Sequence, residues 1–599
     1  MQLSALDWAV IVGYFALNLG VGLWWYRRAS GSTADYFVSG RRAPWWLAGT
    51  SLVATTFAAD TPLVVTGLVF RYGIAGNWLW WGQALSGMLT VFFFARLWRR
   101  AGVLTDMEFA ELRYAGRPAA FLRGFRALYF ALPVNTIILG WVNLAMAKIL
   151  EITLGVERLH AVMFCLALTM IYTTVSGLWA VLWTDLVQFA LAMFVVIALA
   201  VAAVRAVGGV EALAARVAEM DAARGADSLG FLPGPESAWF AMFVVYLSVN
   251  WWASWYPGAE PGGGGYVAQR IFSAKDEKHS LAATLWFNLA HYALRPWPWI
   301  LTALAAVVLY PQAKDPEAAY VRVMVDHLPA SLRGLMLAGF AAAYMSTVST
   351  HINLGASYLV NDFYRRFLRR GADERHYVLA SRAASVLVAL AAGVATYFMT
   401  SLEGAWKFLI ALGAGAGPVF MLRWFWWRIN AWSEVAAMSA AAVWSLVLQS
   451  RLATPLTAQL RDWDPQLPVG PLDPNHPHGF AWLMVLTVGF TTLAWVTVTF
   501  LTPPEPEGHL RAFYRRVRPA SAGWRPIARL EGEASRQSLW WSAADWIAGC
   551  ALVYGALFGV GRLLFGDRMG GAALLLTGAV AGAFIFWDLR RRGWEALSG

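Results

Sequence analysis

Apolar runs of roughly 20 residues, separated by shorter polar segments, follow one another along the whole chain. A helix needs about 20 mostly apolar residues to cross a bilayer, and by this criterion we expect about fifteen membrane-spanning helices. They lie near residues 6–26, 45–71, 77–98, 119–150, 159–177, 179–204, 238–257, 280–310, 331–363, 378–400, 405–425, 431–450, 478–502, 541–564 and 569–588. The pattern predicts an all-α polytopic membrane protein in contact with the lipid bilayer.

Two of these spans contain residues that interrupt a helix. The second carries small and hydroxyl residues with one carboxylate and one proline, in the order Gly49-Thr50-Ser51-Leu52-Val53-Ala54-Thr55-Thr56-Phe57-Ala58-Ala59-Asp60-Thr61-Pro62. The seventh runs into Pro257, Pro261 and four glycines at residues 262–265, and no helix continues through such a run. That stretch is either a loop at the inner surface or the break of a discontinuous helix.

The spacing of the two interruptions predicts a repeat. A disrupted span in second place and another five spans later are typical of a five-plus-five inverted repeat. We therefore expect the first repeat at residues 45–204 and the second at 238–425, with an outer loop at 205–237 between them. Residues 1–44 would form a peripheral first helix with an inner loop, and residues 426–599 further peripheral helices with a basic inner loop at 503–540.

Composition and the distribution of charge indicate in which membrane the protein lies and how it is oriented there. The 599 residues are 59 % hydrophobic and 14 % charged, whereas soluble domains carry about 25 % charged residues. The net charge of +11 does not indicate a nucleic-acid partner, because the arginines gather in alternate loops, as the positive-inside rule requires. With the N-terminus outside, the arginine-rich loops and the C-terminus fall in the cytoplasm. The excess of arginine over lysine suggests a bacterial source, and we expect a multi-pass protein of the bacterial inner (plasma) membrane.

Two segments far apart in the sequence could together hold a sodium ion. Residues 49–62 and 341–350 both place hydroxyls inside apolar runs, where polar groups need a partner or bind something. Na⁺ is a hard cation and takes oxygen ligands. Carbonyls released by a break near residues 54–61, with the hydroxyls of Ser346 and Thr347, could replace its hydration shell. Alternatively, the small residues allow close helix packing and the hydroxyls bond to their own helices.

Ionisable residues inside the spans are further candidates. Arg295 falls near the middle of the eighth span, where a charge is costly. It either binds substrate or forms a structural pair with a neighbouring acid, and both interpretations stay open. Glu260 lies in the interruption of the seventh span, and His291 is interpreted as a packing residue.

Several segments resemble the sodium:solute symporter family, which includes sodium/proline, sodium/sialic acid and sodium/glucose transporters. The stretch from Gly49 to Thr55 resembles the family's first core helix, and Ser176-Gly177-Leu178-Trp179-Ala180-Val181-Leu182-Trp183-Thr184-Asp185-Leu186-Val187-Gln188 is similar to its fifth. Residues 338–347 with Asn353 and 361–364 resemble its eighth, and Gln269-Arg270 with Ala274-Lys275 fits the loop after the sixth. The resemblance covers about residues 5–430.

This resemblance implies the leucine-transporter type of fold, with alternating access. It implies that the sodium ligands are the backbone carbonyls of Ala54, Phe57 and Ala343 and the side chains of Ser346 and Thr347. It also implies that Asp185 lies on the intracellular sodium exit path and that Tyr266 is an inner gate over the substrate. The candidate substrate contacts are Asp60, Thr61, Trp80 and Gln83, with Glu260 and Arg295 from the residue analysis.

The chain departs from the family pattern at two places. Thr56 stands where proline-type members have an aspartate, and Asp60 comes four residues later. The proline and glycine run at 257–265 is longer than usual, with glycine where sugar-type members carry an asparagine. A sugar, a carboxylate and an amino acid therefore all stay open as the solute.

We expect a Na⁺-coupled secondary active symporter that imports a small organic solute, and not an enzyme. Residues 262–265 are not followed by Lys-Ser/Thr, so they are no nucleotide-binding loop. One alternative is proton coupling, with Asp60 or Asp185 titrating. Others are a membrane enzyme that uses Asp60, Glu260, His291 and Arg295 as acids and bases, or a transporter-like sensor, for which residues 430–599 offer no soluble signalling domain.

Overall fold

The computed structural model describes residues 3–26, 39–103, 105–173, 178–237, 239–519, 522–532 and 539–592. Within these ranges the chain is helical, without an extended strand, and one isolated β-bridge joins Ala43 and Ala274. Nine of the described helices are long and apolar enough to cross a membrane, or ten if one bent pair counts as a single span. The other expected spans consist of shorter or interrupted helices, so the count of fifteen stays a prediction. Ser176 and Gly177, part of the family resemblance, lie outside the described residues.

The helices of the predicted first repeat run from residue 45 to residue 207. They are α3 (Trp45–Thr55), α4 (Thr61–Tyr72), α5 (Trp78–Trp81), α6 (Ala84–Leu89), α7 (Ala95–Ala101), α8 (Glu108–Arg113), α9 (Gly116–Tyr129), α10 (Asn135–Leu154), α11 (Arg158–Thr173) and α12 (Leu178–Val207). Those of the second are α14 (Phe240–Val245), α15 (Trp251–Ala253), α16 (Gly265–Ser273), α17 (Glu277–Leu289), α18 (Pro296–Leu309), α20 (Ala330–Ser357), α21 (Glu374–Phe398), α22 (Leu402–Leu412) and α23 (Gly417–Phe425). π-Helical turns join several of them, at residues 90–94, 130–134, 246–250, 290–294 and 358–368.

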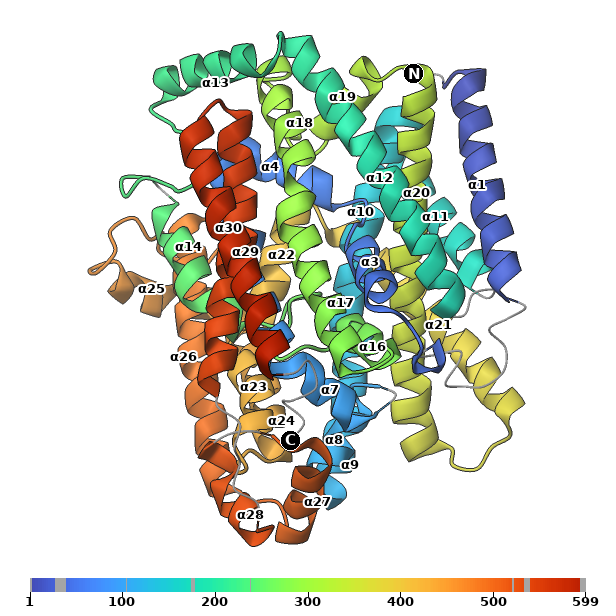
Figure 1. Ribbon diagram of the computed structural model, residues 1–599, viewed down its shortest axis with the longest axis vertical. Coiled ribbons are helices and arrows are strands. Elements are labelled where there is room, and N and C mark those ends of the chain that lie inside the picture. Colours follow the sequence, from blue (N-terminus) through green and yellow to red (C-terminus); the bar gives the residue numbers. More distant parts are fainter. Residues whose placement is uncertain are drawn as a thin grey trace.

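The remaining helices connect or flank the two repeats. They are α1 (Ala5–Tyr26), α13 (Val210–Arg224), α19 (Ala319–His327), α24 (Ala431–Leu448), α25 (Thr454–Leu460), α26 (Pro477–Leu501), α27 (Glu507–Val517), α28 (Arg525–Leu530), α29 (Leu539–Leu564) and α30 (Arg568–Arg592). Figure 1 shows α1 on one flank of the bundle and the antiparallel pair α29 and α30 on the opposite flank, with α3 between them.

The structure confirms that the second span is broken. Helix α3 ends at Thr55 and α4 begins at Thr61, with Pro62 in its first turn, where its missing N–H costs no helical hydrogen bond. The seventh span is broken as well, between Ala253 and Gly265. A Cβ on Gly258 would lie 3.3 Å from the Thr56 methyl group of the first break. This proximity favours the break of a discontinuous helix over a loop at the inner surface.

A third break was not expected. The predicted span 405–425 consists of α22 and α23, bent by 46° at residues 413–416. The Gly415 N–H donates to the Ala253 carbonyl at 2.8 Å, and the Trp255 N–H donates to the Gly413 carbonyl at 3.4 Å. The backbone groups released by this break therefore pair with those released at the end of α15, which is how broken helices satisfy their polar groups away from water.

The C-terminal pair packs directly on the first repeat and on α18. Glycines let α29 and α30 approach closely, since a Cβ on Gly555 would come within 2.7 Å of the Leu574 carbonyl oxygen. Trp546 and Tyr554 of α29 donate to the Leu85 and Trp81 carbonyls, both at 2.9 Å. Helix α29 therefore packs against α5 and α6 and is hydrogen-bonded to both.

Candidate functional site

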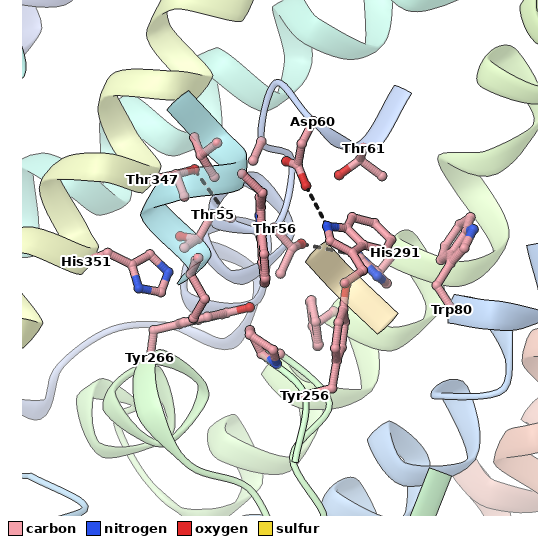
Figure 2. Close-up of a pocket in the computed structure, with 18 of the residues that line it drawn as sticks. Thr55, Thr56, Asp60, Thr61, Trp80, Tyr256, Tyr266, His291, Thr347 and His351 are labelled. Atoms are coloured by element: carbon pink, nitrogen blue, oxygen red, sulfur yellow. Dashed lines mark hydrogen bonds between the residues drawn. The ribbon is translucent and has the colours of Figure 1, made fainter. Parts of the chain in front are cut away.

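A cavity lies between the first two breaks. Its wall is formed by residues of both breaks and by side chains from α10, α16, α17, α20 and α22. Figure 2 shows Asp60 and Thr61 on one side of this cavity and Tyr266 and His351 on another.

Helix α20, which carries three of the predicted sodium ligands, contacts the C-terminal end of α3 where the two helices cross. The Thr347 hydroxyl donates to the Ala343 carbonyl at 3.0 Å and reaches the Thr55 carbonyl across the crossing at 3.5 Å. The Ala54 carbonyl accepts from the Phe57 N–H at 3.0 Å. The side chains of Ala54, Phe57, Ala343 and Thr347 are buried. The crossing therefore concentrates carbonyl and hydroxyl oxygens from both repeats.

Asp185 lies directly beside this crossing. Its carboxylate accepts from the Ser51 hydroxyl of α3 at 2.6 Å and from the Ser346 hydroxyl of α20 at 3.2 Å. Arg270 of α16 donates to the Thr55 hydroxyl at 3.3 Å. One carboxylate on α12 thus joins the two helices that carry the predicted sodium ligands.

The candidate substrate residues divide into two groups. Asp60, Thr61, Trp80 and the predicted gate Tyr266 line the cavity. Gln83, Glu260 and Arg295 are not among its lining residues. Gln83 is buried, and neither atom of its amide has a partner among the described residues. Glu260 is buried beside Gly264 and Gly265, at the start of α16 and behind the cavity wall.

Arg295 lies at the C-terminal end of α3. Its guanidinium donates to the Val53 carbonyl at 2.7 Å, to the Thr56 carbonyl at 3.1 Å and to the Thr56 hydroxyl at 3.0 Å. It also lies 5.2 Å from the Phe57 ring centroid and 4.9 Å from that of Trp299. A cation is favourable at the negative end of a helix. Its partners are thus backbone carbonyls rather than the acid that the sequence suggested.

Other cavity residues were not identified from the sequence as functional. His291 packs against Tyr292, with ring centroids 4.4 Å apart, but it also lines the cavity, and its Nδ1 lies 3.2 Å from the Thr56 hydroxyl. His351 lines it from α20, one helical turn after Thr347, and that spacing was a signal that could have found it. Tyr256, Trp141 and Trp406 complete this set, without any pattern in the sequence that distinguishes them.

Comparisons with known proteins agree on one kind of transporter. The model of the sodium:solute symporter family matches residues 36–441. A sodium/glucose cotransporter of Vibrio parahaemolyticus is 25 % identical over 75 % of this chain and 86 % of its own length. A sodium/mannose cotransporter of Bos taurus is 26 % identical over 85 % of this chain and 88 % of its own length.

Among solved structures, a substrate-bound, outward-open Na⁺-coupled sialic acid symporter superposes with a TM-score of 0.64. The superposition covers 84 % of this chain and 99 % of the symporter. At 19 % sequence identity, the likeness shows a shared fold. The predicted fold class, a leucine-transporter-type inverted repeat with additional helices, is therefore confirmed.

Proposed function

The chain belongs to the sodium:solute symporter family, and from this premise we propose that it imports a small organic solute together with Na⁺ by alternating access. It is a multi-pass membrane transporter and not an enzyme, and Na⁺ is its co-transported ion. We assign it to a bacterial inner membrane, with the N-terminus outside and the C-terminus in the cytoplasm. This orientation follows from the distribution of arginines.

The observation that carries the proposal is the crossing of α3 and α20. There the Thr347 hydroxyl of α20 reaches the Thr55 carbonyl at the end of α3 at 3.5 Å, and Asp185 accepts from Ser51 of α3 and from Ser346 of α20. The proposed Na⁺ ligands beside this contact are the carbonyls of Ala54, Phe57 and Ala343 and the hydroxyls of Ser346 and Thr347. These oxygens now bond to other protein groups, and an entering Na⁺ would replace those bonds. Binding would then hold α3 and α20 in one relative position and bias the equilibrium between two conformations.

The solute cavity adjoins this crossing, which gives a physical basis for coupling. Thr55 and Thr347 belong both to the crossing and to the cavity wall. A Na⁺ ion that fixes their positions would also preorganise the solute site, and by linkage the solute would raise the affinity for Na⁺ equally. We propose Asp60, Thr61 and Trp80 as solute contacts.

Tyr266 is proposed as the inner gate. It is buried at the start of α16 and lines the cavity, and a Cβ on Gly258 would lie 2.5 Å from its hydroxyl. The glycine therefore makes room for this hydroxyl beside the second break. A movement of α16 would carry the ring away from the cavity, and the solute could then leave toward the cytoplasm. Asp185 is proposed to lie on the path by which Na⁺ leaves.

Transport into proteoliposomes tests the proposal. Solutes are screened for uptake under an inward Na⁺ gradient, beginning with glucose and mannose, because two relatives are named for these sugars. We expect uptake with Na⁺ and none with an equal K⁺ gradient. Uptake that persists without Na⁺ but stops when a pH gradient is collapsed would replace Na⁺ coupling by proton coupling, for which Asp60 and Asp185 are the buried carboxylates.

A further inference from the structure

Among the described residues that line the solute cavity, one carries a carboxylate, and no ion pair is found for it. Asp60 lines the cavity and is 2 % exposed. Its Oδ2 accepts from the Trp406 indole N–H at 3.1 Å (Figure 2), and its Oδ1 has no hydrogen-bond partner in the described part of the chain. Among the described residues that line the cavity there is no lysine and no arginine.

The nearby arginine does not pair with this carboxylate. The donors of Arg295 are directed to the Val53 and Thr56 carbonyls and to the Thr56 hydroxyl, and its face is stacked on Trp299. No ion pair between Arg295 and Asp60 is found within the described residues. The carboxylate instead lies at the N-terminus of α4, where the helix dipole favours a negative charge.

Aromatic side chains line the same cavity as Asp60. The Trp406 ring that bonds to Asp60 also packs against Tyr256 at 5.8 Å and Trp141 at 6.4 Å between centroids. Trp80 and Tyr292, stacked at 5.9 Å, line the cavity as well. A carboxylate enclosed by Trp and Tyr faces matches the chemistry that recognises an organic ammonium ion, because both the charge and the ring quadrupoles attract it.

Several other polar groups of the cavity wall already bond within the protein. The hydroxyls of Thr55, Thr56 and Thr347 donate to carbonyls of their own helices, at 2.8, 2.9 and 3.0 Å. Each hydroxyl has one proton, so none of the three retains a donor for the solute. His351 is held by Asn135 at 2.7 Å. The Asp60 Oδ1, by contrast, is a carboxylate oxygen of a lining residue and has no partner among the described residues.

We propose that the co-transported solute is a small organic cation whose ammonium group pairs with Asp60 inside this aromatic enclosure. The inference rests on the proposed symport function and specifies its substrate class. A cationic solute adds its own charge to that of Na⁺, so each cycle would carry more charge inward than with a neutral solute. The membrane potential would then drive the uptake of the solute directly.

The experiment compares probes that differ in charge but not in shape. The melting temperature of the purified full-length protein is measured in constant, saturating NaCl with choline or its uncharged isostere 3,3-dimethylbutan-1-ol. Ethanolamine and histamine serve as further ammonium probes, and glucose as the sugar. We expect saturable stabilisation by at least one ammonium probe and none by the isostere or glucose.

Variants test whether Asp60 is the carboxylate that binds the ammonium group. Asp60→Asn keeps the shape and the Trp406 hydrogen bond but removes the charge. It should weaken ammonium binding about tenfold or more, the size expected for one charge-assisted contact. The matched control Asp462→Asn removes an exposed carboxylate from a loop and should bind the probe like the wild type. If Asp60→Asn does not melt cooperatively, the comparison of choline with its uncharged isostere on the wild type still decides.

Three results would overturn the cationic solute: equal or stronger stabilisation by glucose or by the isostere, no response to any of the three ammonium probes, or unchanged ammonium binding by folded Asp60→Asn. The symport function is tested separately by stabilisation with NaCl over KCl before any probe is added. Stabilisation by Na⁺ without an ammonium response would retain the symporter and reject the substrate class.

Discussion

Replacing Arg295 tests which interactions stabilise the C-terminal end of the broken helix α3. The change is Arg295→Met, which removes every hydrogen-bond donor and keeps a long apolar side chain. In the structure the guanidinium is fully buried and bonds to the last carbonyls of α3, next to the carbonyls proposed for Na⁺. The variant should therefore lose stability and Na⁺ affinity, while the solute cavity, which Arg295 does not line, keeps its chemistry.

The size of the effect follows from the groups left behind. After the change the Val53 carbonyl keeps the Thr56 hydroxyl as a donor at 2.9 Å, whereas the Thr56 carbonyl loses the Arg295 donor. A buried acceptor that loses its partner costs about 1–3 kcal/mol. The lost stacking on Phe57 and Trp299 adds about 0.5–2 kcal/mol. Relief from burying a charge offsets part of this sum, so we expect a net loss of about 1–3 kcal/mol.

The assay is thermal unfolding together with the Na⁺ concentration at half-maximal stabilisation. Arg295→Met should melt earlier and need more Na⁺, and Arg295→Lys, which keeps the charge and some donors, should fall between it and the wild type. The control Arg461→Met, at an exposed position, should change neither value. A variant Arg295→Met with wild-type stability and Na⁺ response but no solute binding would refute the reasoning and make Arg295 a substrate ligand.

Other positions test the packing around the site. Glu434→Gln leaves the buried Arg126 and Arg423 without their shared acid, so thermal unfolding should show a loss of about 3–5 kcal/mol; wild-type stability would mean that the three groups do not form this cluster. Glu317→Gln removes the charge that caps the N-terminus of α22 and should cost about 1–3 kcal/mol, whereas an unchanged melting temperature would argue against the cap. Gly49→Ala places a Cβ 2.6 Å from a backbone carbonyl of α17 and should reduce stability by about 1–3 kcal/mol; normal yield and unfolding would show that α3 and α17 are not in such close contact.

The sequence predicted those breaks that carry a strong local signal. Pro62 and the glycines at 262–265 cannot continue a helix whatever surrounds them, so the first two breaks were foreseeable. The break at residues 413–416 was not, because its Gly-Ala run is apolar and short. It is recognised by hydrogen bonds to Ala253 and Trp255, which are distant in the sequence and therefore visible only in three dimensions.

The candidate site was predictable to a similar extent. The hydroxyls of Ser346 and Thr347 and the break in the second span were enough to predict that these two segments face each other. In the structure the Thr347 hydroxyl lies 3.5 Å from the Thr55 carbonyl at the end of α3. The sequence could not tell that Arg295 faces backbone carbonyls, since carbonyls are present at every position and leave no pattern. Nor could it select Trp141 and Trp406 from 34 tryptophans, because the cavity wall is assembled from helices whose relative rotation no local pattern determines.

The most direct test of the central claim is the melting temperature of the purified protein in NaCl against KCl at equal ionic strength, without added solute. A ligand that binds only the folded state stabilises it by mass action, by about 2.7 kcal/mol at 100 times its Kd. We predict a Na⁺-specific rise that disappears in the double variant Ser346→Ala/Thr347→Ala and persists in Ser349→Ala, whose hydroxyl bonds only within α20. Equal melting in both salts, or a rise that survives the double variant, would contradict a sodium site at the crossing of α3 and α20.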